Sequence, residues 1–436
     1  MHNAATMRQL LPLSLVLILA SACAESPAPA ARAVPPEGLV ITNARILVGD
    51  GTAIDSGAVV VRDGIIVSAS ADTPDVPGAL VIDAGGRTVM PGFVDAHRHV
   101  ISGNAQEWLA GAGDRMREFL EAGFTTVLSA GDDEDAILEL RRRLTEGELA
   151  GPRLIAAGRA PLAGPAAGGG PRPPGDPART DTQRDPSKRP TASAIPTEQT
   201  RARIQEIKAR GFDAVKTVMI VTPRGPERQT LAVVVDEAKR AGIPVITHAT
   251  SVLDTLAAVE AGTTVLVHTP HHDLLTEEQA RTIAASGIPM MSTLGVFVPF
   301  YDEDNTPIFR DAMPFPWTTL PSAGNGPVNA RLVWEAGVPY AFGTDTSFLP
   351  ERTLAHELKS LHLVFSPKDI VTILTRNAAL TAGRGDELGT LEAGKLADIV
   401  IVDGDPLADL FDLLNVDMVI KEGAIVLDAG EEASAE

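Results

Sequence analysis

The sequence predicts an α/β protein in which a (β/α)8 barrel is joined to a small β-sandwich built from both ends of the chain. Apolar runs of strand length alternate with amphipathic segments of helix length through residues 92–385. A glycine usually stands where such a segment gives way to the next apolar run, as at Gly123 and Gly242. Short strand-like runs with hairpin signals fill residues 38–91 and return at 386–430. Alternating helices and strands of this kind indicate βα units around a parallel sheet.

The middle of the chain contains eight candidate strands, the number that closes a (β/α)8 barrel. A glycine in the left-handed conformation commonly ends a helix, which explains the repeated junctions. A doubly wound open sheet is the second interpretation, but no Gly-x-Gly-x-x-Gly phosphate loop follows an early strand. We expect one more helix at 367–382, after the eighth unit. The candidate strands are residues 92–97, 124–129, 153–157, 214–220, 244–248, 264–268, 288–293 and 339–344.

The two ends of the chain carry the hairpin signals. Asp63-Gly64 separates two β-branched runs near the N-terminus, and Glu422-Gly423 does the same near the C-terminus. An aspartate–glycine pair between apolar runs is a strong signal for a two-residue turn. Neither set of strands is large enough to bury a core alone, so we expect the two ends to pack together as the β-sandwich.

The N-terminal segment resembles an export signal. Arg8 precedes an apolar run, Leu10–Ala20, which is too short to span a bilayer comfortably. Small residues then lead to Cys23, the single cysteine of the chain, as in a bacterial lipobox. We therefore predict a lipoprotein signal peptide at 1–22, lipidation of Cys23 and an Ala/Pro-rich tether at 23–37. We expect an exported lipoprotein that is anchored to a membrane and faces the periplasm. Simple secretion with an incidental cysteine is the alternative.

Composition restricts the class of partner. The chain has 436 residues, of which 44% are hydrophobic and 22% charged, as in a globular protein with one large and one small domain. The formal net charge of −20 repels phosphate backbones, so nucleic-acid binding is not expected. A single cysteine excludes an intrachain disulfide. We expect a small-molecule substrate and membrane contact only through the lipid; a homo-oligomer remains open.

The first candidate strand of the barrel ends in two histidines one residue apart. Because side chains alternate along a strand, His97 and His99 should share one face while Arg98 points to the other. Two imidazoles on one face can bind a metal ion. On this segment alone, two incidental histidines are an equal alternative.

The carboxyl ends of the other strands, where barrel enzymes have their active sites, carry matching residues. Strands five, six and eight end in His248, His268 and Asp345, and strand four contains Lys216. A lysine inside a barrel is costly unless it is paired or neutral. It could be a Schiff-base nucleophile, a carbamate formed with carbon dioxide, or the partner of Asp345 in a structural ion pair. The Schiff-base interpretation leaves the histidines unexplained.

These motifs together resemble the amidohydrolase superfamily of metal-dependent hydrolases. The similarity is greatest to its imidazolonepropionase-like and prolidase-like members, and it runs through most of the chain beyond the tether. The matching stretches are Pro91–His99, Gly123–Val127, Gly211–Lys216, Val245–Ala249, Val265–His268, Ala336–Asp345 and Leu388–Val400.

The resemblance implies a ligand set and a reaction. His97, His99 and Asp345 would bind one divalent ion, His248 and His268 the other, and carboxylated Lys216 would bridge them. A hydroxide between the ions would attack the carbonyl, and Asp345 would act as the catalytic residue that passes the proton to the leaving amine. Zinc is the commonest metal for such ligands, with manganese, iron and cobalt also open.

The expected activity is hydrolysis of a C–N bond in an amide, a dipeptide-like molecule, an N-acyl amino acid or a cyclic amide. A lactonase or phosphotriesterase is the alternative within enzymes, because the same metal pair serves those esters. A non-catalytic binding lipoprotein that keeps the fold is the alternative from another class.

The stretch after the third strand, which is expected to contact the substrate, differs from the family pattern. Relatives often carry a Gly-Gly-His-Gly-like stretch after strand three, where this chain has Leu162-Ala163-Gly164-Pro165. Arg159, Arg224 and His271 are candidate substrate contacts, with exposed surface residues as the alternative.

Two long connections, 161–191 and 294–326, follow strands three and seven. The second carries an aromatic cluster that either lines the substrate pocket or forms a local core. Its members are Phe297, Phe300, Tyr301, Phe309, Phe315 and Trp317.

Overall fold

The computed structural model describes residues 35, 37–166, 186–298, 320–347 and 349–430. Cys23, the predicted signal peptide and most of the tether lie outside the described residues, as do Phe300, Tyr301, Phe309, Phe315 and Trp317. None of the helices in the described ranges has the length and apolar character needed to cross a membrane.

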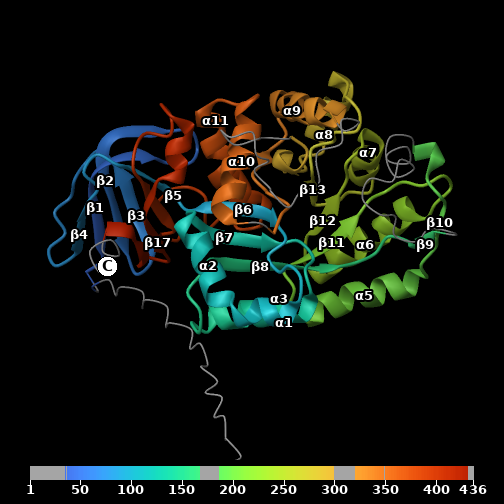
Figure 1. Cartoon of the computed structure of the whole chain (residues 1–436), viewed down its shortest axis with the longest axis horizontal. Helices are drawn as coiled ribbons and strands as arrows, with labels where there is room; N and C mark the ends of the chain where they lie inside the picture. Colours follow the sequence, from blue (N-terminus) through green and yellow to red (C-terminus); the bar gives the residue numbers. More distant parts are fainter. Residues whose placement is uncertain (1–34, 36, 167–185, 299–319, 348, 431–436) are drawn as a thin grey trace, which may run out of the picture.

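Two sheets organise the chain, and Figure 1 shows them side by side. The larger is an eight-stranded parallel sheet in the order β15-β14-β13-β12-β11-β8-β7-β6. Its strands are buried along almost their whole length, as expected for strands covered on both faces. Their bounds are β6 (Phe93–Arg98), β7 (Phe124–Ser129), β8 (Arg153–Arg159), β11 (Ala214–Val218), β12 (Val245–His248), β13 (Val265–Val267), β14 (Met290–Met291) and β15 (Tyr340–Ala341).

The parallel sheet closes on itself between its first and last strands. The Ala96 amide donates to the Phe342 carbonyl at 3.2 Å, and the Thr344 amide donates to the His97 carbonyl at 3.0 Å. Gly343 permits this approach, because a Cβ at that position would lie 2.9 Å from the Cβ of His97. The predicted eight-stranded barrel is therefore confirmed, although β14 and β15 pair over fewer residues than the apolar runs suggested.

Helices surround the barrel on its outer side (Figure 1). The six junction glycines Gly123, Gly211, Gly242, Gly262, Gly287 and Gly337 all have positive φ, between 67° and 97°, as the helix–glycine–strand pattern predicts. The helix expected at 367–382 is interrupted by a π-helical turn, Ile373–Asn377. The helices are α1 (Ala105–Ala110), α2 (Ala112–Glu121), α3 (Glu134–Thr145), α5 (Thr197–Ala209), α6 (Glu227–Ala241), α7 (Val252–Glu260), α8 (Glu277–Ala285), α9 (Leu320–Glu335), α10 (Pro350–His362), α11 (Pro367–Thr372) and α12 (Ala378–Thr381).

The second sheet joins the two ends of the chain, as predicted. Its order is β18-β17-β16-β5-β1-β2-β3, and β4 pairs with β1. The central junction is antiparallel pairing between β5 and β16, which come from opposite ends of the chain. The strands are β1 (Leu39–Leu47), β2 (Ala53–Arg62), β3 (Ile65–Ser70), β4 (Leu80–Asp83), β5 (Thr88–Pro91), β16 (Ile399–Val402), β17 (Val416–Lys421) and β18 (Ala424–Asp428).

One core lies inside this mixed sheet. It combines side chains such as Ile41 and Val59 from the N-terminal strands with Ile399 and Ile420 from the C-terminal strands. The two layers that the sequence suggested as a sandwich thus belong to one continuous sheet around a shared core. The predicted turns at Asp63-Gly64 and Glu422-Gly423 are both present, and a Cβ on Gly423 would lie 2.7 Å from the Cα of Gly64.

The remaining elements are short. Within the connection after β8, β9 (Gly164–Ala166) pairs with β10 (Ala192–Ser193), and η1 (Pro186–Lys188) lies between them. The 3-10 turn η2 (Leu294–Val296) follows β14, and η5 (Leu410–Leu414) lies between β16 and β17.

Candidate metal centre

Six sequence-predicted residues come from the carboxyl-terminal halves or ends of five barrel strands. His97 is in β6 and His99 directly follows it, Lys216 is in β11, and His248 ends β12. His268 follows β13 by one residue, and Asp345 follows β15 by four. Because parallel strands finish at the same rim, these side chains converge on one point although up to 248 residues separate them along the chain.

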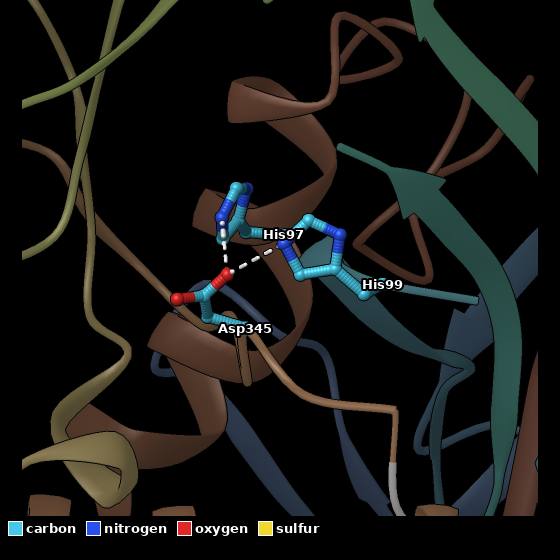
Figure 2. Close-up of side chains that lie close together, drawn as sticks. All are labelled: His97, His99 and Asp345. Carbon is cyan, nitrogen blue, oxygen red and sulfur yellow. Dashed lines mark hydrogen bonds and ion pairs between the residues drawn. The ribbon is translucent and has the colours of Figure 1, made fainter. Parts of the chain in front are cut away.

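His97, His99 and Asp345 form the tightest group (Figure 2). One ligand atom from each residue can be chosen so that the three atoms lie within 4.8 Å of one another. The Nε2 atoms of His97 and His99 lie 2.9 Å and 3.2 Å from the same oxygen, Oδ1 of Asp345. Arg98 points elsewhere, with Nη1 donating to Thr353 Oγ1 at 2.9 Å, as strand alternation requires.

His248 and His268 form the second group. Nε2 of His268 lies 2.6 Å from Nδ1 of His248 and 3.7 Å from Oδ2 of Asp345. Nζ of Lys216 lies 3.4 Å from Nε2 of His97, and the charge of Lys216 also lowers the pKa of His248 and of His268, so the lysine is near both groups. Lys216 forms no ion pair with any described carboxylate, so the structural Lys216–Asp345 pair is not observed.

The backbone turns sharply where three neighbouring strands end. His268, Thr293 and Asp345 follow β13, β14 and β15, and all three have positive φ, at 75°, 50° and 51°. This conformation is unfavourable for residues other than glycine and is often found at functional sites. Here it directs His268 and Asp345 towards the centre of the barrel rim.

Burial keeps most of the imidazoles neutral. It lowers the pKa of His97 to about 4 and that of His248 to about 3, and the pKa of His268 lies well below its usual value for the same reason. Burial would raise the pKa of Asp345, but the surrounding His268 and His97 outweigh it and hold that pKa well below its usual range. Neutral imidazoles and an ionised carboxylate are the protonation states that ligate metal.

Lys216 is also perturbed by burial, which lowers its pKa to about 7. Asp345 opposes the shift and Arg159 adds to it. A substantial neutral fraction of this amine is therefore present near neutral pH, which both carbamate formation and nucleophilic amine chemistry require.

Two supporting residues were missed by sequence reasoning. Asp132, which follows β7 and is 2% exposed in its side chain, lies 3.1 Å from Nδ1 of His99 through Oδ1. Its Oδ2 accepts from the Val100 amide at 2.7 Å and from the Ser129 hydroxyl at 2.7 Å. Thr293 Oγ1 lies 2.6 Å from Nδ1 of His268. Partners of this kind orient metal-ligating imidazoles.

Asp132 carried a signal that could have been used. It stands at the end of a strand, as the predicted ligands do, and reading every carboxylate at strand ends would have included it. Thr293 carried none, because a hydroxyl at a strand end is common and its left-handed backbone cannot be read from the sequence.

A cavity of about 1110 Å³ opens over the centre. His99, Lys216, His248, His268 and Asp345 lie on its wall, and His97 is fully buried beneath. Of the predicted substrate contacts, Arg159 and His271 line the cavity. Arg224 is exposed and is not on its wall.

Phe297 covers one side of the cavity. Its ring stacks on His271 with centroids 3.5 Å apart and forms a T-shaped pair with His268, with centroids 5.8 Å apart. Burial lowers the pKa of His271 to about 3, so this imidazole is neutral. Of the aromatic cluster predicted in this connection, Phe297 is the member within the described residues, and it lines the pocket.

The donor set fits the metals that the sequence resemblance implies. The first group supplies two imidazole nitrogens and a carboxylate oxygen, and the second supplies two imidazoles beside an amine that is easily neutralised. Nitrogen and oxygen donors of this type suit zinc and the neighbouring divalent transition metals. The structure supports a metal site at His97, His99 and Asp345.

The chain is similar in sequence to known imidazolonepropionases. An imidazolonepropionase from Aromatoleum aromaticum is 29% identical over 402 residues, which are 82% of this chain and 88% of that protein. One from Shouchella clausii is 37% identical, but over 111 residues, 24% of this chain and 25% of that protein.

Solved structures extend the similarity to the fold. An amidohydrolase crystal structure is 26% identical with a TM-score of 0.69, covering 89% of this chain and 99% of that one. A putative prolidase from Bifidobacterium longum is 24% identical with a TM-score of 0.71, covering 90% and 95%. At that identity the prolidase supports the fold alone.

The family assignment comes from a sequence model that covers the barrel and the C-terminal part of the mixed sheet. The model described as "Amidohydrolase family" matches residues 88–426, from β5 to β18. The matched region contains every candidate ligand from His97 to Asp345. The chain therefore belongs to the amidohydrolase family and is an enzyme that acts on carbon–nitrogen bonds.

Proposed function

We propose that this chain is an exported, lipid-anchored hydrolase that uses two divalent metal ions to cleave the C–N bond of a small amide. The substrate would be an amide, a dipeptide-like molecule, an N-acyl amino acid or a cyclic amide. The observation that carries the proposal is the convergence of His97, His99 and Asp345 within 4.8 Å, with a second pair of histidines beside them in the same cavity.

Each group of side chains would hold one ion. His97, His99 and Asp345 would bind the first, His248 and His268 the second, and Lys216 would bridge them as its carbamate. When bound, the ions would polarise the substrate carbonyl and lower the pKa of the attacking water. The proximity of Lys216 to both groups supports its bridging role, and so does its lowered pKa of about 7.

Asp345 is suited to move the proton. Its low pKa keeps the carboxylate ionised, so it can accept a proton from the attacking water. Its Oδ1 faces the first histidine pair and its Oδ2 faces His268, so the carboxylate lies between the two groups. From there it can deliver the proton to the nitrogen of the leaving amine, which is otherwise a poor leaving group.

Metal content per chain tests this proposal directly. The protein without residues 1–23 would be purified with bicarbonate and the chosen metal, beside Lys216→Ala. Two ions per wild-type chain, falling to one or none in the variant, are expected if the carbamate bridges the pair. Wild-type protein and variant would then be screened on amides, dipeptides, N-acyl amino acids and cyclic amides, with a lactone as comparison.

Two outcomes would contradict the proposal. One ion per chain that Lys216→Ala leaves unchanged would indicate a mononuclear site without a bridge. A fully loaded protein that turned over the lactone and none of the amides would move the activity to ester bonds.

Export and anchoring are proposed from the sequence around Cys23. Expression in a bacterial host with labelled palmitate should label the wild type and leave Cys23→Ser unlabelled. Label that persists in Cys23→Ser would contradict lipidation at this residue.

A further inference from the structure

We propose that Arg159 binds a carboxylate of the substrate, and that the substrate is an amide carrying both a free carboxylate and an apolar side group. An N-acyl amino acid or a dipeptide with an apolar residue fits this description. The inference rests on the proposed function, because it names the substrate class of the same cavity.

Arg159 faces the reaction centre because of strand register. It ends β8, and in the parallel pairing of β8 with β11 it is the partner of Lys216. Paired residues of parallel strands project from the same face of a sheet, so both side chains enter the cavity. Both lie on its wall, and the charge of Arg159 contributes to the low pKa of Lys216.

The direction of the Arg159 side chain is set by the backbone beneath it. Its Nε donates to the carbonyl of Gly131. A Cβ at Gly131 would lie 2.8 Å from Nε and 2.9 Å from Cγ of Arg159, and Gly131 has a φ of 93°. The arginine arm therefore lies against a glycine whose backbone leaves room for it. The two terminal nitrogens form no ion pair with any described residue.

Arg189, the second arginine on the cavity wall, has a structural role and serves as a comparison for Arg159. Arg189 is 7% exposed, and its Nη1 and Nη2 donate to the two oxygens of Asp254 at 2.8 Å and 3.0 Å. Nη1 also donates to the Val221 carbonyl at 2.9 Å. Arg189 is thus occupied by the protein, whereas Arg159 lines the cavity and its two terminal nitrogens form no ion pair within the described residues. Two such nitrogens match a carboxylate in bidentate geometry.

Partly exposed apolar side chains also line the cavity. Val218 is two residues beyond Lys216 on β11, so it shares the inward face, and it is 45% exposed. Ile220 and Val296, 46% and 39% exposed, also line the cavity. Large apolar side chains left uncovered in a cavity wall are suited to an apolar ligand group. The cationic Arg159 and the apolar wall together indicate an amide that carries a carboxylate and an apolar side group.

Paired ligands that differ by one charge test the inference. Binding of N-acetyl-L-leucine and of N-acetyl-L-leucinamide to the metal-loaded protein would be measured by calorimetry, together with their rates of hydrolysis. The acid should bind about 10- to 100-fold more tightly than the amide, the range expected for a charged hydrogen-bonded pair. Arg159→Gln should abolish this preference by raising KM for the acid, change KM for the amide far less, and be partly rescued in Arg159→Lys. Arg62→Gln, which removes an exposed arginine at the end of β2, is the matched control.

The outcomes separate this inference from the proposed function. Preferential binding of the acid that is lost in Arg159→Gln supports the inference even if neither compound is hydrolysed, a result that would count against the proposed function instead. Equal binding of acid and amide to the wild type would overturn the inference. So would an equal fall of kcat for both compounds in Arg159→Gln, since that would mean Arg159 acts only through Lys216.

Discussion

On the β6 side of the centre His99 is hydrogen-bonded to a buried carboxylate, whereas on the β13 side His268 is hydrogen-bonded to a hydroxyl. The consequences for the two imidazoles are opposite. The bond to Asp132, with that to Asp345, raises the pKa of His99 to about 9. Burial lowers the pKa of His268, and Thr293 contributes no charge to oppose it.

Each side nevertheless contains a buried carboxylate that supports a histidine. One carboxylate contacts its histidine directly, and the other acts through the turn that follows β14. On the β6 side Asp132 touches the imidazole directly. On the β13 side Glu357, from α10, accepts from the amides of Leu294 and Gly295 at 2.9 Å and 2.6 Å and so holds the turn that begins at Thr293. The comparison teaches that, without metal, direct support by a carboxylate favours the protonated imidazole, which must lose its proton to bind an ion. Indirect support leaves the imidazole neutral.

The largest effect is expected where the two sides meet, at Asp345. Asp345→Asn should reduce kcat roughly 10²- to 10⁴-fold, because the amide cannot accept the proton of the attacking water. Turnover would be measured on the best amide from the screen, beside metal content by mass spectrometry. A loss of turnover with both ions retained isolates the proton-transfer role. Turnover close to that of the wild type would refute it.

The indirect support by Glu357 can be tested through the pH dependence of the free energy of unfolding. Burial raises its pKa from 4.5 to about 7, so the folded state binds this proton more tightly than the unfolded chain does. Its contribution to stability is therefore complete below pH 4.5 and is lost as the pH rises to about 7. Over that interval the wild type should lose up to about 3 kcal/mol relative to Glu357→Gln, which does not titrate.

Urea midpoints of the metal-free wild type and Glu357→Gln between pH 4.5 and 8 would measure this difference. Wild-type and variant profiles that run parallel across this range would show that Glu357 does not titrate there, and that the turn is held in another way.

The smallest effects are expected at the two residues that touch the histidines. Asp132→Asn should weaken binding of the metal held by His97, His99 and Asp345 by about 10- to 100-fold, the range typical of such supporting residues. Thr293→Val, which removes only a hydroxyl, should weaken the site of His248 and His268 by less. Competition with a chelator would measure both affinities.

A neighbouring substitution controls for the direct carboxylate. Asp133→Asn makes the same chemical change one residue along, at the N-cap of α3, where no candidate ligand is in contact. It should leave metal affinity unchanged. An equal loss of metal affinity in Asp132→Asn and Thr293→Val would contradict the proposed difference between direct support by a carboxylate and support by a hydroxyl.

Much of this centre was predictable because strand ends are visible in a sequence. His97, Lys216 and His248 lie within apolar runs whose bounds the structure reproduces to within a few residues. Arg159 and Arg224 looked equivalent, since both come near the ends of strands. The structure separates them, because Arg159 belongs to β8 itself while Arg224 lies six residues beyond the end of β11 and is exposed.

The sequence by itself determined the barrel, the union of the two chain ends and the kinds of donor at the rim. Periodicity, glycine junctions and residue type are local properties, so they can be read from the chain. Tertiary structure alone decided how His268 points. Val267 pairs with His248 on the inward face, so simple alternation would turn His268 outward, and its φ of 75° turns it back to the centre. That conformation is uncommon for residues other than glycine, and the hydrogen bond between His268 and Thr293 helps to hold it.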